Sequence, residues 1–496
     1  MPALLAATPI AVILVLMGLW QWSAAATGAV GLAVALALAL TLFDLGAIAG
    51  VGAAPAALGA LAETLHSSAT ILWIILPALS LYELQQRSGA IDRIRHALTG
   101  LTEARRLQAL LIAWFFGLFM EGAAGFGTPV ALAAPLLVGI GFPPVRAVVL
   151  ALLGHAAGVS FGAVGTPVLT QAGVTGIDAG HIAAATALLH AMVGFILILT
   201  LVRLAGDEPL RRSDVGWSAL AGLCFFLPSL TLAVFAGPEL PTLGGALIGG
   251  LVFATLLWRT RPATTNSGSH RHLLADLAPY GIILVLVLCT RLLPDVRAAL
   301  TGIAIDWQLF DAYRGRFEPL FHPGSLLSIG LLLGAVSTGR IAHVLPSVAA
   351  AVTRLVPVAI ALLAMLALSR VMVHSGMIGE LAAAAARSGP VWPLLAPALG
   401  VLGTFVTGSA TASNILFSDF QLGTASALAL SPVAMLAAQS FGAAIGNVVA
   451  PHNIIAGSAT VGLKGREGEV LAQTVLPCLL MVLAGGVLLL VFTAAG

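Results

Sequence analysis

Long runs of apolar residues, separated by short polar stretches, dominate this chain. A membrane-spanning helix needs about 20 mostly apolar residues. Twelve runs approach or exceed that length, at 3–20, 26–43, 66–84, 147–173, 181–202, 217–236, 242–258, 276–292, 323–339, 346–374, 431–456 and 471–494. The pattern predicts an all-α, polytopic membrane protein with about twelve transmembrane helices. Stretch 45–65 is rich in Ala and Gly and fits either a short interfacial helix or a poor span.

Two further apolar regions, 107–142 and 392–425, are too long for one span, and Gly, Ser or Thr interrupts each near its middle. Irregular backbone is tolerated at membrane depth only where protein or a water-filled site surrounds it. We therefore expect two re-entrant hairpins, each with a polar tip. Runs 147–173 and 431–456 carry similar interruptions and predict two broken helices.

The positive residues orient these segments, because loops on the cytoplasmic side are enriched in Lys and Arg. Residues 85–106 hold five arginines, so this loop is expected in the cytoplasm. If 107–142 returns to the same side, most later arginine groups also become cytoplasmic. The polar stretch 262–275 then forms a cytoplasmic linker between an N-terminal half (1–261) and a C-terminal half (276–496).

The two halves contain an internal repeat. Gly117–Gly122 aligns with Gly403–Gly408 at an offset of 286 residues, and His155…Gly162…Pro167 aligns with Gln439…Gly446…Pro451 at 284. The first hairpin would enter from the cytoplasm and the second from the periplasm, which predicts two inverted repeats. Transporters built in this way bind substrate near the midplane, between discontinuous helices.

Composition agrees with a membrane protein, because only 8% of the residues are charged and 59% are hydrophobic, whereas soluble chains carry about 25% charged residues. The net charge of +2 comes from scattered arginines, so no nucleic-acid surface is expected. The three cysteines lie in apolar runs without a metal or haem motif, and neither a metal nor a cofactor is expected. The first apolar run lacks a basic segment before it, which favours a retained helix over a signal peptide.

Glu121 is the only charged residue between Arg106 and Arg146, and it is the second residue of the sequence MEGAAGFGTP at 120–129. A carboxylate within a bilayer costs about 2.5 kcal/mol or more and usually serves a function. Glu121 is therefore the candidate proton-coupling residue. His155 joins it in that role, because it matches Gln439 in the repeat.

The interruptions also collect groups suited to an anion. Helix N-termini offer unpaired N–H groups and the positive end of the dipole, and hydroxyl and amide side chains add donors. The candidate substrate-binding residues are Gly122, Gly125, Gly127, Thr128, Ser160, Thr166, Ser409, Thr411, Ser413, Asn414, Gln439, Asn447 and Arg370. Small residues also serve close helix packing in membranes, and that reading stays open for each of them. Two roles are open for Arg370: it contacts a substrate carboxylate through its planar fork, or it extends to the membrane interface.

Several strings resemble the bacterial L-lactate permease family. They are LFMEGAAGFGTPVALAAPLLVGIGF at 118–142, FGAVGTP at 161–167, TGSATASNILFSDFQ at 407–421 and IAGSATVGLK at 455–464. The resemblance covers essentially the whole chain. It implies a symporter of the bacterial cytoplasmic (inner) membrane that moves lactate or glycolate with protons, within the wider ion-transporter superfamily with paired hairpins.

The chain departs from the family pattern at a few positions. Ala410 stands where the family usually has an acid, His155 where Asn is frequent, Arg370 where a neutral residue is usual, and His452 where Gln is usual. These departures leave open a different organic anion, larger or dicarboxylic, and sodium coupling. The partners expected are a small organic anion, protons and the lipid bilayer, and a homo-oligomer is compatible with the sequence.

Two other classes of protein compete with a transporter. An intramembrane enzyme would need a nucleophile with a base, an acid pair or an HExxH helix, and the sequence contains no HExxH and no acid pair at a plausible depth. A passive anion channel is the remaining alternative, and a buried acid at a helix interruption disfavours it.

Overall fold

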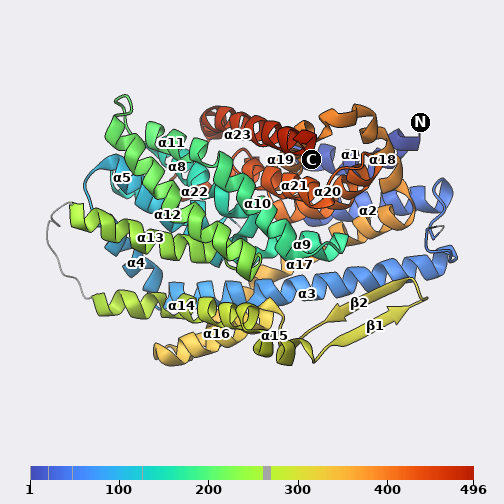
Figure 1. Ribbon diagram of the computed structural model, residues 1–496, viewed down its shortest axis with the longest axis horizontal. Coiled ribbons are helices and arrows are strands. Elements are labelled where there is room, and N and C mark those ends of the chain that lie inside the picture. Colours follow the sequence, from blue (N-terminus) through green and yellow to red (C-terminus); the bar gives the residue numbers. More distant parts are fainter. Residues whose placement is uncertain (1, 21, 47, 126, 261–269, 496) are drawn as a thin grey trace.

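Helices form almost the entire molecule, as the computed structural model shows for residues 2–20, 22–46, 48–125, 127–260 and 270–495 (Figure 1). Within these residues, 11 helices are long and apolar enough to cross a membrane, or up to 12 if one bent pair is a single span. The prediction of an all-α polytopic protein with about twelve spans is confirmed. Most of the predicted linker lies outside the described residues, and its last part, from residue 270, is already helical.

The first half consists of fifteen helical segments, two of which (η1 and η2) have π or 3-10 geometry. They are α1 (Pro2–Gly18), α2 (Ala24–Thr41), α3 (Ala53–Arg87), α4 (Ala90–Thr99), α5 (Arg105–Ala109), η1 (Leu110–Phe116), α6 (Gly117–Ala123), α7 (Thr128–Gly139), α8 (Pro144–His155), η2 (Ala156–Phe161), α9 (Gly162–Thr175), α10 (Ala179–Val193), α11 (Phe195–Leu204), α12 (Arg212–Ala236) and α13 (Pro241–Thr260).

The second half begins with α14 and contains the only strands among the described residues. Its elements are α14 (His270–Leu292), α15 (Pro294–Thr301), β1 (Ile305–Leu309), β2 (Tyr313–Phe317), α16 (Pro323–Ser337), η3 (Ile341–His343), α17 (Val344–His374), α18 (Met377–Ala385), η4 (Ala386–Val391), α19 (Trp392–Thr407), α20 (Ala410–Ala427), α21 (Pro432–Gly446), α22 (Pro451–Thr460) and α23 (Glu467–Ala495).

Short polar residues fix where several of these helices begin. The side chain of Asp178 accepts a hydrogen bond from the His181 amide at the start of α10, and that of Ser409 accepts one from the Ala412 amide at the start of α20. Such N-caps satisfy amide groups that have no partner inside the helix. Pro144, Pro432 and Pro451 occupy the first helical turn, where their missing N–H costs nothing.

Two local expectations need correction. The Ala/Gly-rich stretch is neither a separate interfacial helix nor a separate span, because from Ala53 it is continuous with the next segment in the 35-residue helix α3. The charged loop after α15 forms an antiparallel hairpin in which Ile305 pairs with Phe317 and Leu309 with Tyr313. Its turn places Phe310 and Asp311 in the left-handed region, as primed hairpin turns require.

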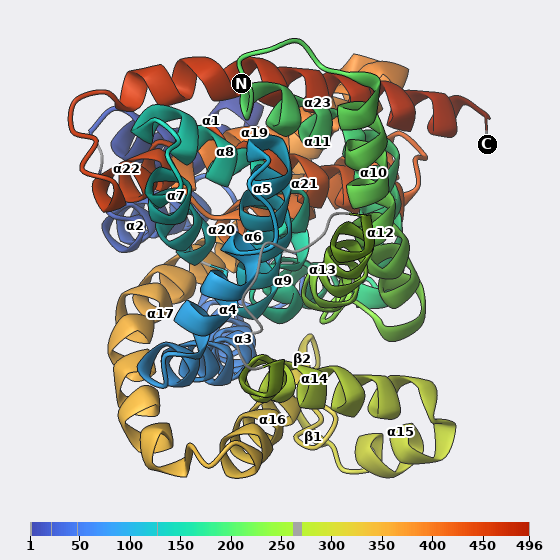
Figure 2. The same ribbon diagram turned by 90° about the vertical axis from the view of Figure 1, so that its left-hand side faces the viewer.

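The helices divide between two regions that Figure 2 separates clearly. α14, α15, α16 and the β-hairpin lie together at one end, where α14 and α16 pack on each other and α16 packs on α3. The long helices α3 and α17 pack along each other beside this group. α17 also packs on α2. The remaining helices surround α8, α9 and α21.

The two helices predicted to be broken are among the most enclosed elements of the described chain. The apolar window within Pro144–Thr175 is 100% buried, and that within Pro432–Thr460 is 83% buried, against 33% for the window in α23. An element without lipid contact can carry irregular backbone and polar groups, because protein surrounds it. These two segments therefore form the centre on which a site can be built.

Candidate functional site

The first interruption separates α6 from α7. α6 ends at Ala123, and α7 begins at Thr128 and packs back on α6 and η1. Gly125 and Gly127 adopt φ values of 58° and 78°, which glycine reaches without steric cost. This turn occupies the predicted tip of the first hairpin.

The second interruption separates α19 from α20, which also pack on each other. Gly408 ends α19 in a left-handed conformation with φ of 68°, and Ser409 is the N-cap of α20. Here the turn is only two residues long, because a glycine C-cap and a serine N-cap follow each other directly.

The two central segments are interrupted in different ways. After α8 the chain passes through η2 and a left-handed turn in which Ala163, Val164 and Gly165 have φ values of 43°, 55° and 81°. After α21 it leaves helical conformation between Asn447 and Ala450, and α22 restarts at Pro451. Left-handed backbone is rare for alanine and exceptional for a β-branched residue such as Val164.

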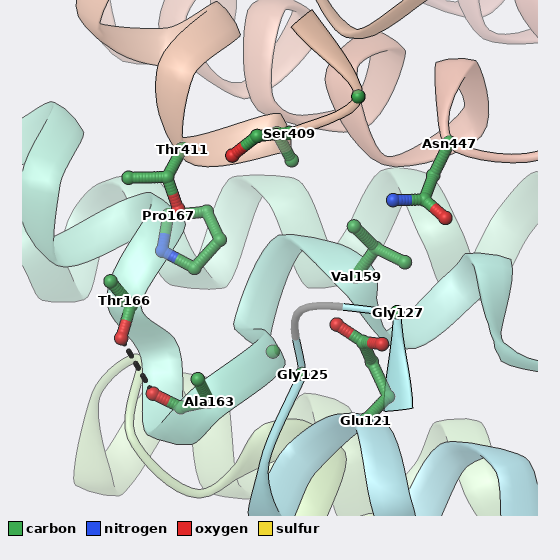
Figure 3. A pocket seen from close by; sticks show the side chains of 13 residues that line it. Glu121, Gly125, Gly127, Val159, Ala163, Thr166, Pro167, Ser409, Thr411 and Asn447 are labelled. Carbon is green, nitrogen blue, oxygen red and sulfur yellow. Dashed lines mark hydrogen bonds between the residues drawn. The ribbon is translucent and has the colours of Figure 1, made fainter. Parts of the chain in front are cut away.

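All four interruptions meet around one cavity of about 50 Å³ (Figure 3). Seven of the residues that the sequence predicted line it: Glu121, Gly125, Gly127, Thr166, Ser409, Thr411 and Asn447. Because a water molecule needs roughly 10–15 Å³ on this measure, the cavity can hold only a few water molecules or a ligand of a few heavy atoms.

The cavity lies at the positive ends of two helices. α20 begins at its wall, and the first bond within that helix runs from the Ser413 amide to the Ser409 carbonyl, so the amides of Ala410 and Thr411 precede it. Gly127, the N-cap of α7, lies on another part of the wall. Unpaired N–H groups and aligned dipoles at such ends attract anions.

Side chains add donors at the same wall. The Thr411 hydroxyl and the amide nitrogen of Asn447 make no hydrogen bond with any other described residue. Figure 3 shows Ser409, Thr411 and Asn447 on one side of the cavity and Glu121 and Gly125 on the other. The Thr166 hydroxyl is already used, since it donates to the Ala163 carbonyl at 2.6 Å.

Among the described residues that line this cavity, Glu121 is the only one with a charged side chain. It is 5% exposed, and its carboxyl group forms no hydrogen bond or ion pair with the described residues. Gly162 makes room for it, because a Cβ atom at that position would collide with the Glu121 carboxyl oxygen. Burial without a cationic or hydrogen-bonding partner among the described residues is costly for a carboxylate.

His155 does not line the cavity but contacts Asn447, which does. Its Nδ1 is 2.7 Å from the Ala151 carbonyl oxygen, and its Nε2 is 3.2 Å from the Asn447 side-chain oxygen. The predicted proton-coupling histidine therefore contacts a cavity residue without lining the cavity itself.

The structure places six other predicted residues outside the cavity lining. Gly122 packs on the Leu243 backbone, and the Thr128 hydroxyl donates to the Gly125 carbonyl and supports the first turn. The remaining four bond with neighbouring helices: Ser160 with the Ser440 carbonyl and His190, Ser413 with the Gly400 carbonyl, Asn414 with the Pro167 carbonyl, and Gln439 with Ser413.

Arg370, the last predicted contact, also lies away from this cavity. It donates to Asp419 at 2.8 Å and to the Val174 carbonyl at 2.9 Å. Asp419 therefore lies inside the protein as its partner rather than at the interface, with 12% of its side chain exposed. Arg370 lines a separate cavity of about 690 Å³ bounded by α3, α9, the loop before α13 and the β-hairpin.

Several lining residues were not predicted: Val159, Gly162, Ala163, Pro167, Gly408 and Ala410. Most contribute backbone or small side chains, which carry little chemical signal in a chain rich in Ala and Gly. The density of glycines around 162–165 was the available signal. Among the described residues, no group of three or more His, Cys, Asp or Glu side chains could hold a metal ion.

Comparisons with known proteins agree with this architecture. The family model described as L-lactate permease matches residues 2–312 and 312–494. The glycolate permease of Escherichia coli is 30% identical over 462 residues, covering 82% of this chain and 81% of its own, and the L-lactate permease of Bacillus subtilis is 30% identical over 468 residues, covering 83% and 82%. Among solved structures, the YdaH transporter of Alcanivorax borkumensis matches with a TM-score of 0.50 at 16% identity, covering 89% of this chain and 88% of its own, which supports the fold alone.

Proposed function

The chain belongs to the L-lactate permease family, and from that premise we propose that it imports a small monocarboxylate by proton symport across the bacterial cytoplasmic membrane. L-lactate, D-lactate and glycolate are the candidate substrates. Membership in a family of permeases with 11 or 12 candidate spans makes it a multi-pass protein of the inner membrane and a transporter rather than an enzyme.

The small cavity supports a monocarboxylate as the substrate. The N-terminus of α20, the Thr411 hydroxyl and the Asn447 amide can donate hydrogen bonds to one carboxylate, and a ligand hydroxyl can bond with Ser409. A volume of about 50 Å³ is far below the roughly 300–1,000 Å³ of sites for larger molecules. The described lining contains no arginine or lysine to receive a second carboxylate, which argues against a dicarboxylic or larger anion.

Glu121 supports coupling to protons, and this single observation carries the proposal. Two carboxylates in one small, largely buried cavity repel each other strongly unless one of them is protonated. Substrate binding therefore requires a proton on Glu121, and release of the anion allows that proton to leave. Each carboxylate then moves together with at least one proton.

The two helical turns support alternating access. In the proposed inverted arrangement, the tip between α6 and α7 reaches the site from the cytoplasmic side, and the tip between α19 and α20 reaches it from the periplasmic side. Either tip then separates the substrate from one compartment.

Uptake into proteoliposomes tests this function. With an alkaline interior, labelled L-lactate, D-lactate or glycolate is expected to accumulate above its equilibrium level, and a protonophore should abolish that accumulation. Succinate should compete poorly, and a sodium gradient alone should drive no uptake. Equilibration without accumulation would identify a passive channel, and accumulation driven only by sodium would replace the proton in the proposal.

A further inference from the structure

Both ring nitrogens of His155 face oxygen atoms, which restricts how the ring can be protonated. The Ala151 carbonyl oxygen, 2.7 Å from Nδ1, can only accept a hydrogen bond, so Nδ1 carries a hydrogen. A neutral imidazole has one N–H group only. Nε2 is therefore an acceptor when His155 is neutral and a donor when His155 is charged.

Asn447 is the partner of Nε2 and has two unlike ends. Its side-chain oxygen accepts and its NH₂ group donates, so the end that faces His155 determines which end faces the cavity. A neutral His155 needs the NH₂ group, which leaves the oxygen for the cavity. A protonated His155 needs the oxygen, which leaves the NH₂ group for the cavity.

The orientation of the Asn447 amide in the structure matches the second arrangement. The Asn447 oxygen lies 3.2 Å from Nε2, and Figure 3 shows the amide nitrogen on the side of Ser409. The backbone of Asn447 is held separately, since the Asn453 side chain donates to the Asn447 carbonyl at 3.3 Å. The side-chain amide can therefore reverse without moving the helix interruption.

We propose that Asn447 acts as an amide switch, which presents a donor to the bound carboxylate when His155 is protonated and an acceptor when His155 is neutral. This inference rests on the proposed function and adds a second proton to it. Because an oxygen of Asn447 would repel the substrate carboxylate, anion binding and protonation of His155 favour each other. His155 acts through Asn447, so it is a positioning residue rather than a substrate contact.

Other titratable groups surround this pair. The helices packed on α8 and α21 carry Glu121 on α6, His181 and His190 on α10, Arg203 on α11, Asp419 on α20, His452 on α22, and Glu467, Glu469 and Cys478 on α23, while α8 itself carries Arg146. Of these, only Glu121 lines the cavity. His155 forms no ion pair with the described residues, so a test must separate its proton from that of Glu121.

The experiment counts protons taken up on substrate binding. Isothermal titration of the purified full chain with L-lactate or glycolate, in buffers of different ionisation enthalpy, gives this number directly. Glu121→Gln removes the carboxyl proton, so the remaining uptake near neutral pH is expected to approach one proton and to come from His155. The affinity of this variant should fall by up to about tenfold for each pH unit above the titration range of His155.

Two further changes in the same background test the switch. Adding His155→Gln should abolish the remaining proton uptake. Adding Asn447→Ala should also abolish it although His155 is intact, because the connection to the substrate is cut, and should weaken binding at acidic pH by about tenfold. Adding His190→Gln, which removes a buried histidine outside the cavity, is the matched control and should leave the proton count unchanged.

The outcomes distinguish this inference from the proposed function. If the wild type binds none of the monocarboxylates, the proposed function fails and the switch with it. If the wild type binds but proton uptake persists with Asn447→Ala, or is already absent with Glu121→Gln alone, only the switch is overturned. Equal weakening at every pH with an unchanged proton count would show that Asn447 is merely structural.

Discussion

The two cavities of this protein differ in whether their charged side chains have partners of opposite charge. The small cavity contains one carboxyl group, Glu121, with no partner among the described residues. The larger cavity contains charges that are largely paired: Arg370 with Asp419, Arg291 with Glu239, and Arg316 with Glu318. Arg291 also lies over the Phe321 ring, 3.9 Å from its centre.

The difference indicates which groups change their protonation state during function and which stabilise the folded structure. A paired charge is stabilised by its partner in every state, so the protein gains nothing by titrating it. An unpaired buried carboxyl group is stable only when it is protonated or when its surroundings change. We therefore expect changes in the small cavity to alter transport and changes in the larger cavity to alter stability.

The largest effect is expected for Glu121→Gln. The amide resembles a permanently protonated carboxyl group, so the anion still binds but cannot be coupled to a proton. Accumulation driven by a proton gradient should be lost, whereas exchange of external for internal substrate should continue. Both are measured with labelled substrate in proteoliposomes, and unchanged accumulation would remove Glu121 from its coupling role.

Arg370→Gln should mainly reduce stability. Removing one partner of a buried ion pair costs about 3–5 kcal/mol, because the other charge stays behind. Thermal unfolding should show a clear decrease, and the double variant Arg370→Gln with Asp419→Asn should recover part of it. If the single variant instead keeps its stability and loses substrate affinity, Arg370 contacts the substrate and the contrast between the cavities fails.

Thr411→Val and Ser413→Ala form a matched pair of smaller changes on one helix. The Thr411 hydroxyl faces the cavity without a partner, so Thr411→Val should weaken substrate binding by about tenfold. The Ser413 hydroxyl donates to the Gly400 carbonyl at 2.9 Å, so Ser413→Ala should lower thermal stability and leave affinity nearly unchanged. Titration of binding and thermal unfolding on both variants separate the two roles, and the reverse assignment would move the site along α20.

The smallest effect concerns His322, which precedes α16 and lines the larger cavity. Burial, together with Arg291 and His66, lowers the pKa of His322 from 6.5 to about 4. Its neutral form is favoured in the folded protein, so stability is full above about pH 6.5 and decreases as the pH falls toward 4. At about pH 5.5 the loss is about 1 kcal/mol. His322→Asn keeps an N-cap and should remove this part of the acid sensitivity in pH-dependent thermal unfolding.

Much of the lining of the small cavity, the candidate site, could be predicted because glycines and polar residues interrupt otherwise uniform apolar runs. Glu121, Gly125, Ser409 and Asn447 were found in that way, and all of them line the small cavity. The interruptions were also found at the right places along the chain, since a helix in a membrane cannot continue through such sequences without a reason.

The orientation of individual side chains could not be predicted. Thr411 and Ser413 are two residues apart on one helix, so they point in nearly opposite directions, and only tertiary packing determines which one faces the cavity. The partner of Arg370 could not be found either, because Asp419 belongs to another helix. The β-hairpin did carry a signal, the alternation Ile305, Trp307, Leu309, but the charged residues around these positions concealed it.

The left-handed conformation of Val164 has a consequence for engineering this protein. A β-branched residue held at φ of 55° costs roughly 1–3 kcal/mol, so Val164→Gly should raise thermostability. Selections for robust expression or heat resistance would therefore tend to recover substitutions here, beside Ala163 in the cavity wall. Variants obtained in that way would be more stable to heat, but the backbone beside the cavity wall would be more flexible. Their transport rate should be measured before they are used in place of the native chain.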